Sequence, residues 1–550
     1  MKLHELTEKI KKELSNVLLK LEYSDLVDDI ILETPKEKTN GDYSTNLAMK
    51  LAKPLRKNPF IIAEEIMNNI NKEGLFIEKL VLARPGFINF FLDKSFLLET
   101  INEINDLKED YGNLTIGKND HYNIEFVSVN PTGSLHIGHC RGAAAGDSIS
   151  RILKKAGFKV TKEYYLNDGG NQIHNLALSV DARYKQLFDL DAKIPEDGYN
   201  GPEIIEVAKA LKAEFGDTLL TKDSYDFIKK YSVENLLDSL KEDLDSFGVE
   251  FDVWFREKQL YDNNEVDNVV KFLKENNFTY EFEGAIWLKT SMFDDEKDRV
   301  IVKSDGTYTY ITPDIAYHKN KLSRGYTKLI DILGGDHHGY IDRLKASIEM
   351  IGGKSDLLEV EILQMVKVIQ DGKEVKMSKR SGKAITLRDI LEDVGPDPIR
   401  YFFAARSLNT QMDLDLDLAL KQTSENPVYY AQYAHARINS IFNAAVTKGF
   451  DMTNLPTTFK TINSVKAYDL ITQLAEYERV IESAALKRQP HRIANYINQL
   501  ATKFHSFYND EIVLSDDSVS TYERLALLNA TKIVLKDSLN LIGVSAPNKM

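Results

Sequence analysis

Residues 122–165 decide the fold, and they read YNIEFVSVNPTGSLHIGHCRGAAAGDSISRILKKAGFKVTKEYY. An apolar run from Ile124 to Val129 precedes the turn-forming residues 130–133, a helical pattern continues to Leu153, and a second β-prone run covers 160–165. Strand, loop, helix and strand in this order make a βαβ unit. Such a unit predicts a parallel sheet and an α/β fold.

A second unit of the same kind follows later in the chain. The stretch 329–333, apolar except for Asp331, leads to Gly334-Gly335, and we expect a helix over 342–351 and a strand near 360–365. Two βαβ units predict a doubly wound parallel sheet. Between them, the acidic, helix-rich stretch of about 179–290 is interpreted as an insertion.

The remaining regions divide the chain into four parts. Residues 1–112 begin with an amphipathic helix and form a small α+β domain, and 113–370 form the sheet domain. In 371–425, Asp371-Gly372 between apolar residues predicts a hairpin that directs 376–382 outward as a loop. Helical spacing replaces strand signals in 426–550, which we expect to be a helical domain closed by Gly543.

Composition excludes several classes of protein. The 550 residues carry a net charge of −14, which excludes a wholly basic nucleic-acid coat protein but permits a local basic face. Residues 427–550 hold 13 Lys and Arg against 11 Asp and Glu, so they repel phosphate least. The single cysteine, Cys140, excludes an intrachain disulfide and a four-thiolate zinc site, and favours a reducing cytoplasm. No stretch is apolar for about 18 residues, so we expect no membrane span and no secretory signal.

His136-Ile137-Gly138-His139 follows a predicted strand and opens a helix. Two imidazoles and free backbone amides at the positive end of a helix dipole suit a triphosphate, and Gly138 leaves room for a nucleotide base against the backbone. The alternative is a pair of histidines that cap the helix or hold a stray metal ion.

Lys376-Met377-Ser378-Lys379 is the second motif with chemical meaning. Two lysines three residues apart on a loop can reach a pyrophosphate from the side opposite the histidines, although such a motif alone more often marks a solvated basic turn. Together, the two motifs lie in the order that a nucleotide-binding doubly wound sheet requires.

These motifs resemble the HIGH and KMSKS signatures of class I aminoacyl-tRNA synthetases. Further stretches resemble the bacterial arginyl-tRNA synthetases, and the resemblance runs from about residue 41 to residue 547. The stretches are NPTG at 130–133, EYYLND at 163–168, YITPDIAYH at 310–318, GDHHGY at 335–340 and YAHARI at 433–438. Some arginyl enzymes lack the second lysine motif and carry a lysine just before HIGH, whereas this chain has Gly133-Ser134-Leu135 there and keeps both loop lysines.

The resemblance implies a Rossmann-like catalytic domain, an N-terminal domain that contacts the tRNA elbow, and a C-terminal helical bundle that binds the anticodon. It implies ATP-dependent activation of L-arginine and its transfer to tRNA(Arg), with Mg²⁺ entering as the ion of ATP and no structural metal in the protein. It also implies that activation requires bound tRNA. We expect a cytoplasmic monomer.

The resemblance assigns residues to each substrate. The catalytic residues are His136, His139, Lys376 and Lys379, and the ATP-binding residues are Gly138, Asp336, His337, Met377 and Ser378. The arginine-binding residues are Glu125, Ser128, Asn130, Tyr310 and Asp314, with the last two at the guanidinium. The tRNA-binding residues are Tyr429, Tyr433 and Arg437.

Each assignment has a structural alternative. A carboxylate suits a guanidinium because it accepts fork-shaped hydrogen bonds, but Asp314 could instead cap a helix over 315–319, and Glu125 could face outward from an alternating strand. The tyrosines near residue 430 could form an aromatic core stripe. At the level of function, the alternatives are a class I synthetase of another specificity and a paralogue that binds RNA without catalysis.

Overall fold

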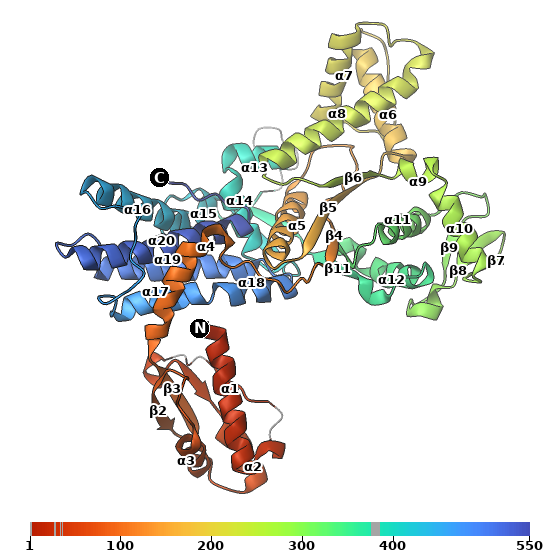
Figure 1. Cartoon of the computed structure of the whole chain (residues 1–550). Helices are drawn as coiled ribbons and strands as arrows, with labels where there is room; N and C mark the ends of the chain where they lie inside the picture. Colours follow the sequence, from red (N-terminus) through yellow and green to blue (C-terminus); the bar gives the residue numbers. More distant parts are fainter. Residues whose placement is uncertain (1–2, 27–28, 34, 36, 376–384) are drawn as a thin grey trace.

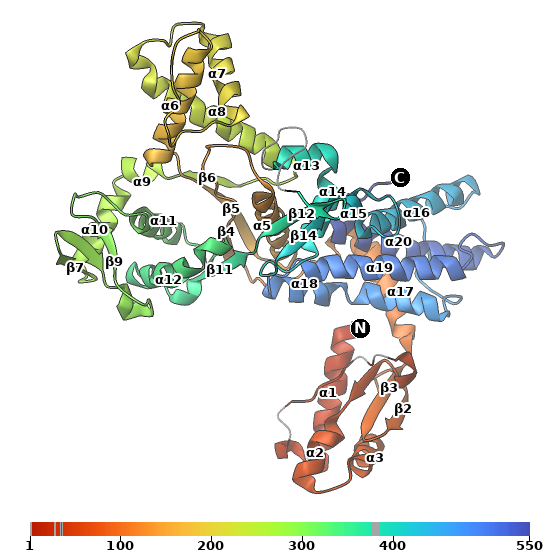
Figure 2. The same cartoon turned by 180° about the vertical axis from the view of Figure 1, so that it is seen from behind.

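The computed structural model describes the chain from Leu3 to Met550 except residues 27–28, 34, 36 and 376–384 (Figure 1). A central α/β region lies between a helical bundle and smaller peripheral parts. The N-terminal domain and a long helical excursion project from opposite sides of the molecule in both side views (Figures 1 and 2). None of the described helices is long and apolar enough to cross a membrane.

The N-terminal domain is α+β, as the sequence predicts. Its elements are α1 (Leu3–Lys20), β1 (Tyr43–Thr45), α2 (Leu47–Leu55), α3 (Pro59–Asn69), β2 (Ile77–Ala83) and β3 (Phe87–Leu92). The strands form an antiparallel sheet in the order β1-β3-β2. The apolar face of α1 is buried, since Leu6, Ile10 and Leu14 are at most 1% exposed.

The central sheet has five strands, and every neighbouring pair is parallel. The strands are β4 (His121–Glu125), β5 (Lys159–Leu166), β6 (Val253–Arg256), β10 (Lys328–Gly334) and β11 (Leu358–Leu363). Their order is β11-β10-β4-β5-β6. Helix α5 (Ile137–Lys155) connects β4 to β5, and α12 (Ile341–Met350) connects β10 to β11. The chain therefore leaves β4 and β10 in opposite directions, which confirms the doubly wound sheet and puts its switch point between these strands.

Helix α5 packs closely on the sheet because of Gly146. A Cβ atom at this position would lie 2.2 Å from the Phe126 ring, so a larger residue would force the helix away from β4. The residues of α5 from Cys140 to Ser150 are all buried. The position of the helix start, with its two histidines, is thereby fixed against the end of β4.

The stretch 179–290 is not one helical insertion, contrary to the sequence-based expectation. Helices α6 (Gly170–Gln186), α7 (Pro202–Phe215) and α8 (Tyr225–Ser246) pack around a core of their own. The chain then returns to the central sheet as β6, which pairs with β5. This four-residue strand was not recognised because it is too short to show a period between long helical patterns.

A second excursion separates β6 from β10. It comprises α9 (Lys258–Asp262), α10 (Glu265–Glu275), β7 (Thr279–Phe282), β8 (Ala285–Leu288), β9 (Arg299–Val302) and α11 (Ile311–Ser323). The three strands form a separate antiparallel sheet. Helix α11 then runs back toward the central sheet and delivers several buried polar side chains to it.

The predicted hairpin is present. Strands β12 (Val366–Gln370) and β13 (Lys373–Glu374) are antiparallel, and Asp371 and Gly372 have φ angles of 53° and 69°, as a two-residue hairpin turn requires. On its other edge, β12 pairs with β14 (Met412–Asp415) in parallel. The connecting helices are α13 (Leu387–Asp393), α14 (Pro396–Ala404) and α15 (Leu416–Leu420).

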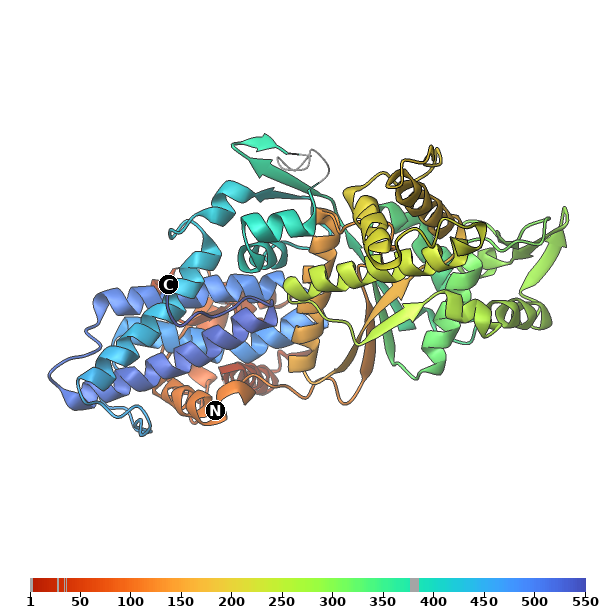
Figure 3. The same cartoon turned by 90° about the horizontal axis from the view of Figure 1, so that it is seen from above.

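The C-terminal region is a bundle of long helices beside the α/β region, as the view from above shows (Figure 3). These are α16 (Pro427–Thr447), α17 (Val465–Ala475), α18 (Tyr477–Leu486), α19 (His491–Asp510) and α20 (Ser518–Leu541). Gly543 follows α20 with a φ of 67°, which confirms its predicted role as a helix stop. Helix α4 (Leu98–Leu107) joins the bundle, since the Asn105 side chain donates to the Ala526 carbonyl at 3.1 Å.

Candidate active site

The two histidines of the HIGH motif cap helix α5. Nδ1 of His136 accepts the Gly138 backbone N–H at 3.1 Å, and Nδ1 of His139 accepts the His136 backbone N–H at 3.3 Å. The two rings stack with their centroids 3.4 Å apart. Because both Nδ1 atoms accept, each neutral ring carries its proton on Nε2, which remains available as a donor.

Burial favours the neutral form of both rings. It lowers the pKa of His136, and burial together with the adjacent His136 ring lowers the pKa of His139 to about 3. At neutral pH the pair therefore offers two N–H donors at the positive end of the α5 dipole rather than two full charges. The capping alternative is thus observed, and it leaves the phosphate-binding role open because capping uses the Nδ1 atoms only.

This helix start lies at the switch point of the sheet. It follows β4, and the adjacent strand β10 ends at Gly334, where a 3₁₀ turn over Gly335–Tyr340 begins. The chain after the second lysine motif returns to the same place, since the Leu387 N–H donates to the Leu135 carbonyl at 2.7 Å. Three segments far apart in sequence therefore meet where doubly wound folds bind nucleotides.

Several predicted residues lie outside what the structure describes. Residues 376–384 are not described, and they include Lys376, Met377, Ser378 and Lys379. The side chains of Asp336 and His337 are not described either.

The end of β4 has an unusual backbone. The sequence suggested a strand as far as Val129, but the strand ends at Glu125, and Val127 and Ser128 have φ angles of 69° and 44°. A β-branched residue rarely adopts this conformation, which costs about 1–3 kcal/mol. The turn directs the Ser128 hydroxyl back to Glu125 Oε1, 3.0 Å away, and the same hydroxyl accepts the Tyr165 N–H at 3.1 Å.

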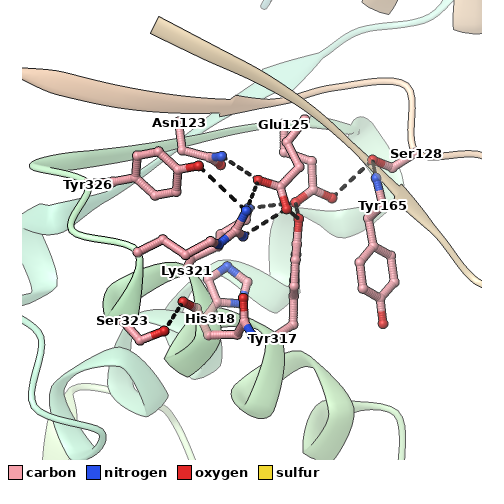
Figure 4. A network of polar contacts seen from close by, with 12 residues as sticks. Asn123, Glu125, Ser128, Tyr165, Tyr317, His318, Lys321, Ser323 and Tyr326 are labelled. Atoms are coloured by element: carbon pink, nitrogen blue, oxygen red, sulfur yellow. Dashed lines mark hydrogen bonds and ion pairs between the residues drawn. The ribbon is translucent and has the colours of Figure 1, made fainter. Parts of the chain in front are cut away.

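Glu125 is part of a buried polar network between β4, β5, β10 and α11 (Figure 4). Its Oε2 accepts from Lys321 Nζ at 2.6 Å and from the Tyr317 hydroxyl at 2.8 Å. Lys321 is fully buried and also donates to Asp331 Oδ1 at 3.1 Å. Burial raises the pKa of Glu125, and the Lys321 cation opposes this rise. Glu125 is only 8% exposed, so it does not face outward from the strand.

Asp314 is the fourth residue of α11, in its first turn, so it is not the helix cap. Its carboxylate accepts a hydrogen bond from the Tyr340 hydroxyl. Glu257 lies nearby and accepts from the Tyr165 hydroxyl at 2.8 Å. Burial raises the pKa of both carboxyls, and the negative charge of Asp314 also raises the pKa of Glu257.

Asp314 and Glu257 share an environment that favours a cation. Burial, followed by the charges of Glu257, Asp314 and Glu125, raises the pKa of Tyr165, and the Tyr165 hydroxyl donates directly to Glu257. Within the described residues, neither Asp314 nor Glu257 forms an ion pair with a lysine or arginine. Two half-buried carboxylates that, among the described side chains, are bound by tyrosine hydroxyls can accept a planar cation with several donors.

The other predicted arginine-binding residues are close to the end of β4 or to the start of α11. The Asn130 side-chain amide donates to Gln172 Oε1 of α6. Tyr310 precedes α11 directly, and its side chain is 89% exposed. The structure thus joins Ser128 to Glu125, connects Glu125 to α11 through Tyr317 and Lys321, and leaves the Tyr310 ring at the surface. Asp314 lies on the same helix, α11.

Sequence reasoning missed Glu257, Tyr165 and Tyr340. Both tyrosines stand in stretches that the family resemblance had singled out, but no role was attached to them. Glu257 directly follows β6, the strand that was not recognised, and it had no local signal of its own. Among the described residues, no group of three or more His, Cys, Asp or Glu side chains is arranged to hold a metal ion.

The predicted tRNA-binding residues lie along helix α16. The rings of Tyr429 and Tyr433 stack at 6.2 Å, and the Arg437 guanidinium lies 4.9 Å from the Tyr433 ring and 5.1 Å from that of Tyr508. Arg437 and Tyr508 also line a surface cleft of about 780 Å³. Tyr429, Tyr433 and Arg437 are half-buried. They are therefore neither buried in the core of the bundle nor fully exposed to solvent.

Three family models match the chain. They are described as the arginyl tRNA synthetase N terminal domain for residues 4–92, the class I (R) tRNA synthetase catalytic domain for 101–442, and the DALR anticodon binding domain for 431–550. The catalytic model alone covers more than half of the chain.

Curated proteins and solved structures agree with these models. The chain is 49% identical over 547 residues to arginine–tRNA ligase 2 of Bacillus thuringiensis and 48% identical over 547 residues to the arginine–tRNA ligase of Bacillus subtilis, with 98% of both chains covered in each case. A Campylobacter jejuni crystal structure assigned as an arginyl-tRNA synthetase has 35% identity and a TM-score of 0.78, over 84% of this chain and 100% of that one. The Thermus thermophilus arginyl-tRNA synthetase, at 20% identity and a TM-score of 0.75 over 99% of this chain and 100% of that one, shares the fold.

Proposed function

This chain belongs to the arginyl-tRNA synthetase family, and from that premise we propose how its residues divide the work of the reaction. The enzyme activates L-arginine with ATP and transfers it to tRNA(Arg). The arginine carboxylate attacks the α-phosphorus, which gives arginyl-adenylate and releases pyrophosphate. A ribose hydroxyl of the terminal adenosine then attacks the activated carbonyl, and AMP leaves.

Asp314 and Glu257 bind the guanidinium. The single observation that carries this assignment is the pair of half-buried carboxylates that accept from the Tyr340 and Tyr165 hydroxyls and have raised pKa values. A guanidinium would stabilise both carboxylates in their ionised form. It would donate hydrogen bonds to the carboxylate oxygens that the tyrosine hydroxyls leave unoccupied. Tyr310, with its exposed ring just before α11, is available to cover the bound side chain.

Glu125, Ser128 and Asn130 at the end of β4 bind the polar groups at the other end of arginine. Glu125 is already neutralised by Lys321, so its part is to orient Ser128 and to offer a fixed acceptor rather than a bare charge. The left-handed turn at 127–128 supports this assignment, since strained backbone of this kind persists at ligand sites where the surroundings enforce it.

His136 and His139 donate Nε2–H hydrogen bonds to the phosphates of ATP. Lys376 and Lys379 approach from the loop side, and Gly138, Met377, Ser378, Asp336 and His337 contact the nucleotide. Mg²⁺ enters as the ion of ATP. Catalysis in this scheme consists of positioning and charge stabilisation, without a covalent enzyme intermediate.

The helical bundle of residues 426–550 binds the anticodon. Tyr429, Tyr433 and Arg437 support this role because stacked rings next to a guanidinium suit unpaired bases. The domain of residues 1–112 contacts the elbow of the tRNA, and the catalytic region spans 113–370 with its connection at 371–425. We propose a monomer that acts in the cytoplasm, where the tRNA is used.

Charging of total tRNA, with each of the twenty amino acids supplied separately, tests this function. Arginine alone should be attached, and the product should be a tRNA that reads arginine codons. Attachment of lysine or of any other amino acid at a comparable rate would overturn the assignment of the pocket.

A further inference from the structure

Arg141 is a buried cation two residues after His139. It lies in the first turns of α5 and is 1% exposed. Its guanidinium makes three hydrogen bonds of 2.8 Å: Nη1 donates to the Gln364 carbonyl, and Nη2 donates to the carbonyls of Ser407 and Thr410. All three acceptors belong to the main chain.

These carbonyls stand at the entrances of two paired strands. Gln364 lies two residues before β12, and Ser407 and Thr410 precede β14. The two strands pair in parallel from Val366 and Met412 onward. One side chain of the histidine-bearing helix therefore fixes the starts of both strands of this small sheet.

The same sheet leads to the lysine motif. Strand β12 turns at Asp371-Gly372 into β13, and the chain then enters the segment that holds Lys376 and Lys379. Beyond that segment, Leu387 bonds to Leu135 at the start of α5. The described chain on both sides of the motif is thus attached to α5, on one side through Arg141 and on the other through the main chain.

We propose that Arg141 is a positioning residue for arginine activation, which holds the β12–β14 sheet in register with the histidine pair and thereby fixes the strands from which the chain enters the lysine motif. This inference rests on the proposed phosphate role of Lys379. A guanidinium suits the task because its planar fork gives the three bonds fixed directions, which a lysine ammonium cannot do. Misplacement of a catalytic group by about 1 Å can lower a rate about 100-fold.

A double-mutant cycle tests the proposal. Single-turnover adenylate formation is measured with tRNA present in the wild type, Arg141→Met, Lys379→Ala and the double mutant. Arg141→Met should lower the rate constant at saturating ATP and arginine about 100-fold, with the ATP dissociation constant changed by less than about threefold. Because Arg141 acts through the lysine, the double mutant should be no more than about threefold slower than Lys379→Ala.

Arg400 provides a matched control. It is also 1% exposed and donates to main-chain carbonyls, those of Ile542 and Phe247, which lie outside β12 and β14. Unlike Arg141, it also forms an ion pair with a carboxylate, Asp147 of α5, at 2.6 Å. In the Arg400→Met/Lys379→Ala double mutant, the fold-loss in rate should equal the product of the fold-losses of the two single variants. Thermal melting reports whether Arg141→Met folds; if it does not, Arg141→Lys replaces it in the same cycle, since lysine keeps the charge but reaches fewer carbonyls.

The outcomes are distinguishable. If the fold-losses in rate of the Arg141 and Lys379 variants multiply in the double mutant, the positioning role is wrong. A wild-type rate in the folded Arg141 variant would also overturn it. A wild-type rate in Lys379→Ala would refute the proposed function of the lysine itself, and the inference that depends on it.

Discussion

Asp314→Asn should weaken arginine far more than ATP. Asparagine has the same shape as aspartate, and its carbonyl oxygen can still accept the hydrogen bond from Tyr340, so the start of α11 should keep its structure. The substitution removes one of the two carboxylates proposed to hold the guanidinium. Only Glu257 would then face the cation.

The magnitude follows from the surroundings of the carboxylate. Loss of one partner of a desolvated charge pair costs about 2–5 kcal/mol. Asp314 is half-buried, so the lower part of this range applies, and a loss of about 2–3.4 kcal/mol corresponds to a Michaelis constant for arginine that is about 30- to 300-fold higher. The proposed ATP site at the start of α5 is separate from Asp314, so the Michaelis constant for ATP should change by less than about threefold.

The assay is arginine-dependent ATP–pyrophosphate exchange with tRNA present and with each substrate varied in turn. Asp226→Asn is the control, because Asp226 also lies in the first turn of a helix, α8, but is exposed and distant from the site. If the Michaelis constant for arginine in Asp314→Asn stays within about twofold of the wild type, or if that for ATP rises equally, the carboxylate pair is not the guanidinium site.

Three further predictions concern other parts of the account. Burial raises the pKa of Asp314 and Glu257, and only their ionised forms bind a cation. The value of kcat/KM for arginine should therefore fall with decreasing pH, with a midpoint above that of free carboxyls; a midpoint at or below that of free carboxyls would contradict this. Arg437→Gln should weaken tRNA binding by about 1–3 kcal/mol in a filter-binding assay, with the arginine Michaelis constant unchanged, whereas unaltered tRNA affinity would remove Arg437 from the interface. Gly146→Ala should lower the free energy of unfolding by about 1–3 kcal/mol in urea because its Cβ would overlap the Phe126 ring, while Gly142→Ala, whose Cβ would lie 3.5 Å from Leu363, should change it little.

Local patterns predicted the parts of the fold that depend on local physics. The two βαβ units, the hairpin at Asp371-Gly372 and the helix stop at Gly543 all follow from periodicity and turn chemistry within a few residues. The histidine pair could be placed at a helix start for the same reason. Strand β6 could not be predicted from the sequence, because its four residues are too few to show an alternating pattern between long helices.

The interior of the site depends on contacts that sequence order conceals. Lys321 bonds to Glu125 across 196 positions, and Tyr165 meets Glu257 across 92. Their partners are set by the order of strands in the sheet rather than by neighbouring residues. The left-handed turn at Val127 is similarly invisible, since a valine there would ordinarily predict a continued strand. Arg141 could be seen beside the histidines, but its three carbonyl partners became apparent only from the folded chain.

Comparison of arginine with citrulline tests whether the pocket selects a cation. Citrulline has nearly the same shape, but a neutral urea group replaces the guanidinium, so it probes the charge of the pocket without changing its size. If Asp314 and Glu257 hold a cation, the inhibition constant of citrulline in pyrophosphate exchange should exceed the Michaelis constant for arginine at least about 100-fold, and Asp314→Asn should narrow that ratio. If the inhibition constant of citrulline equals the Michaelis constant for arginine, in the wild type and in Asp314→Asn alike, Asp314 and Glu257 do not select a cation.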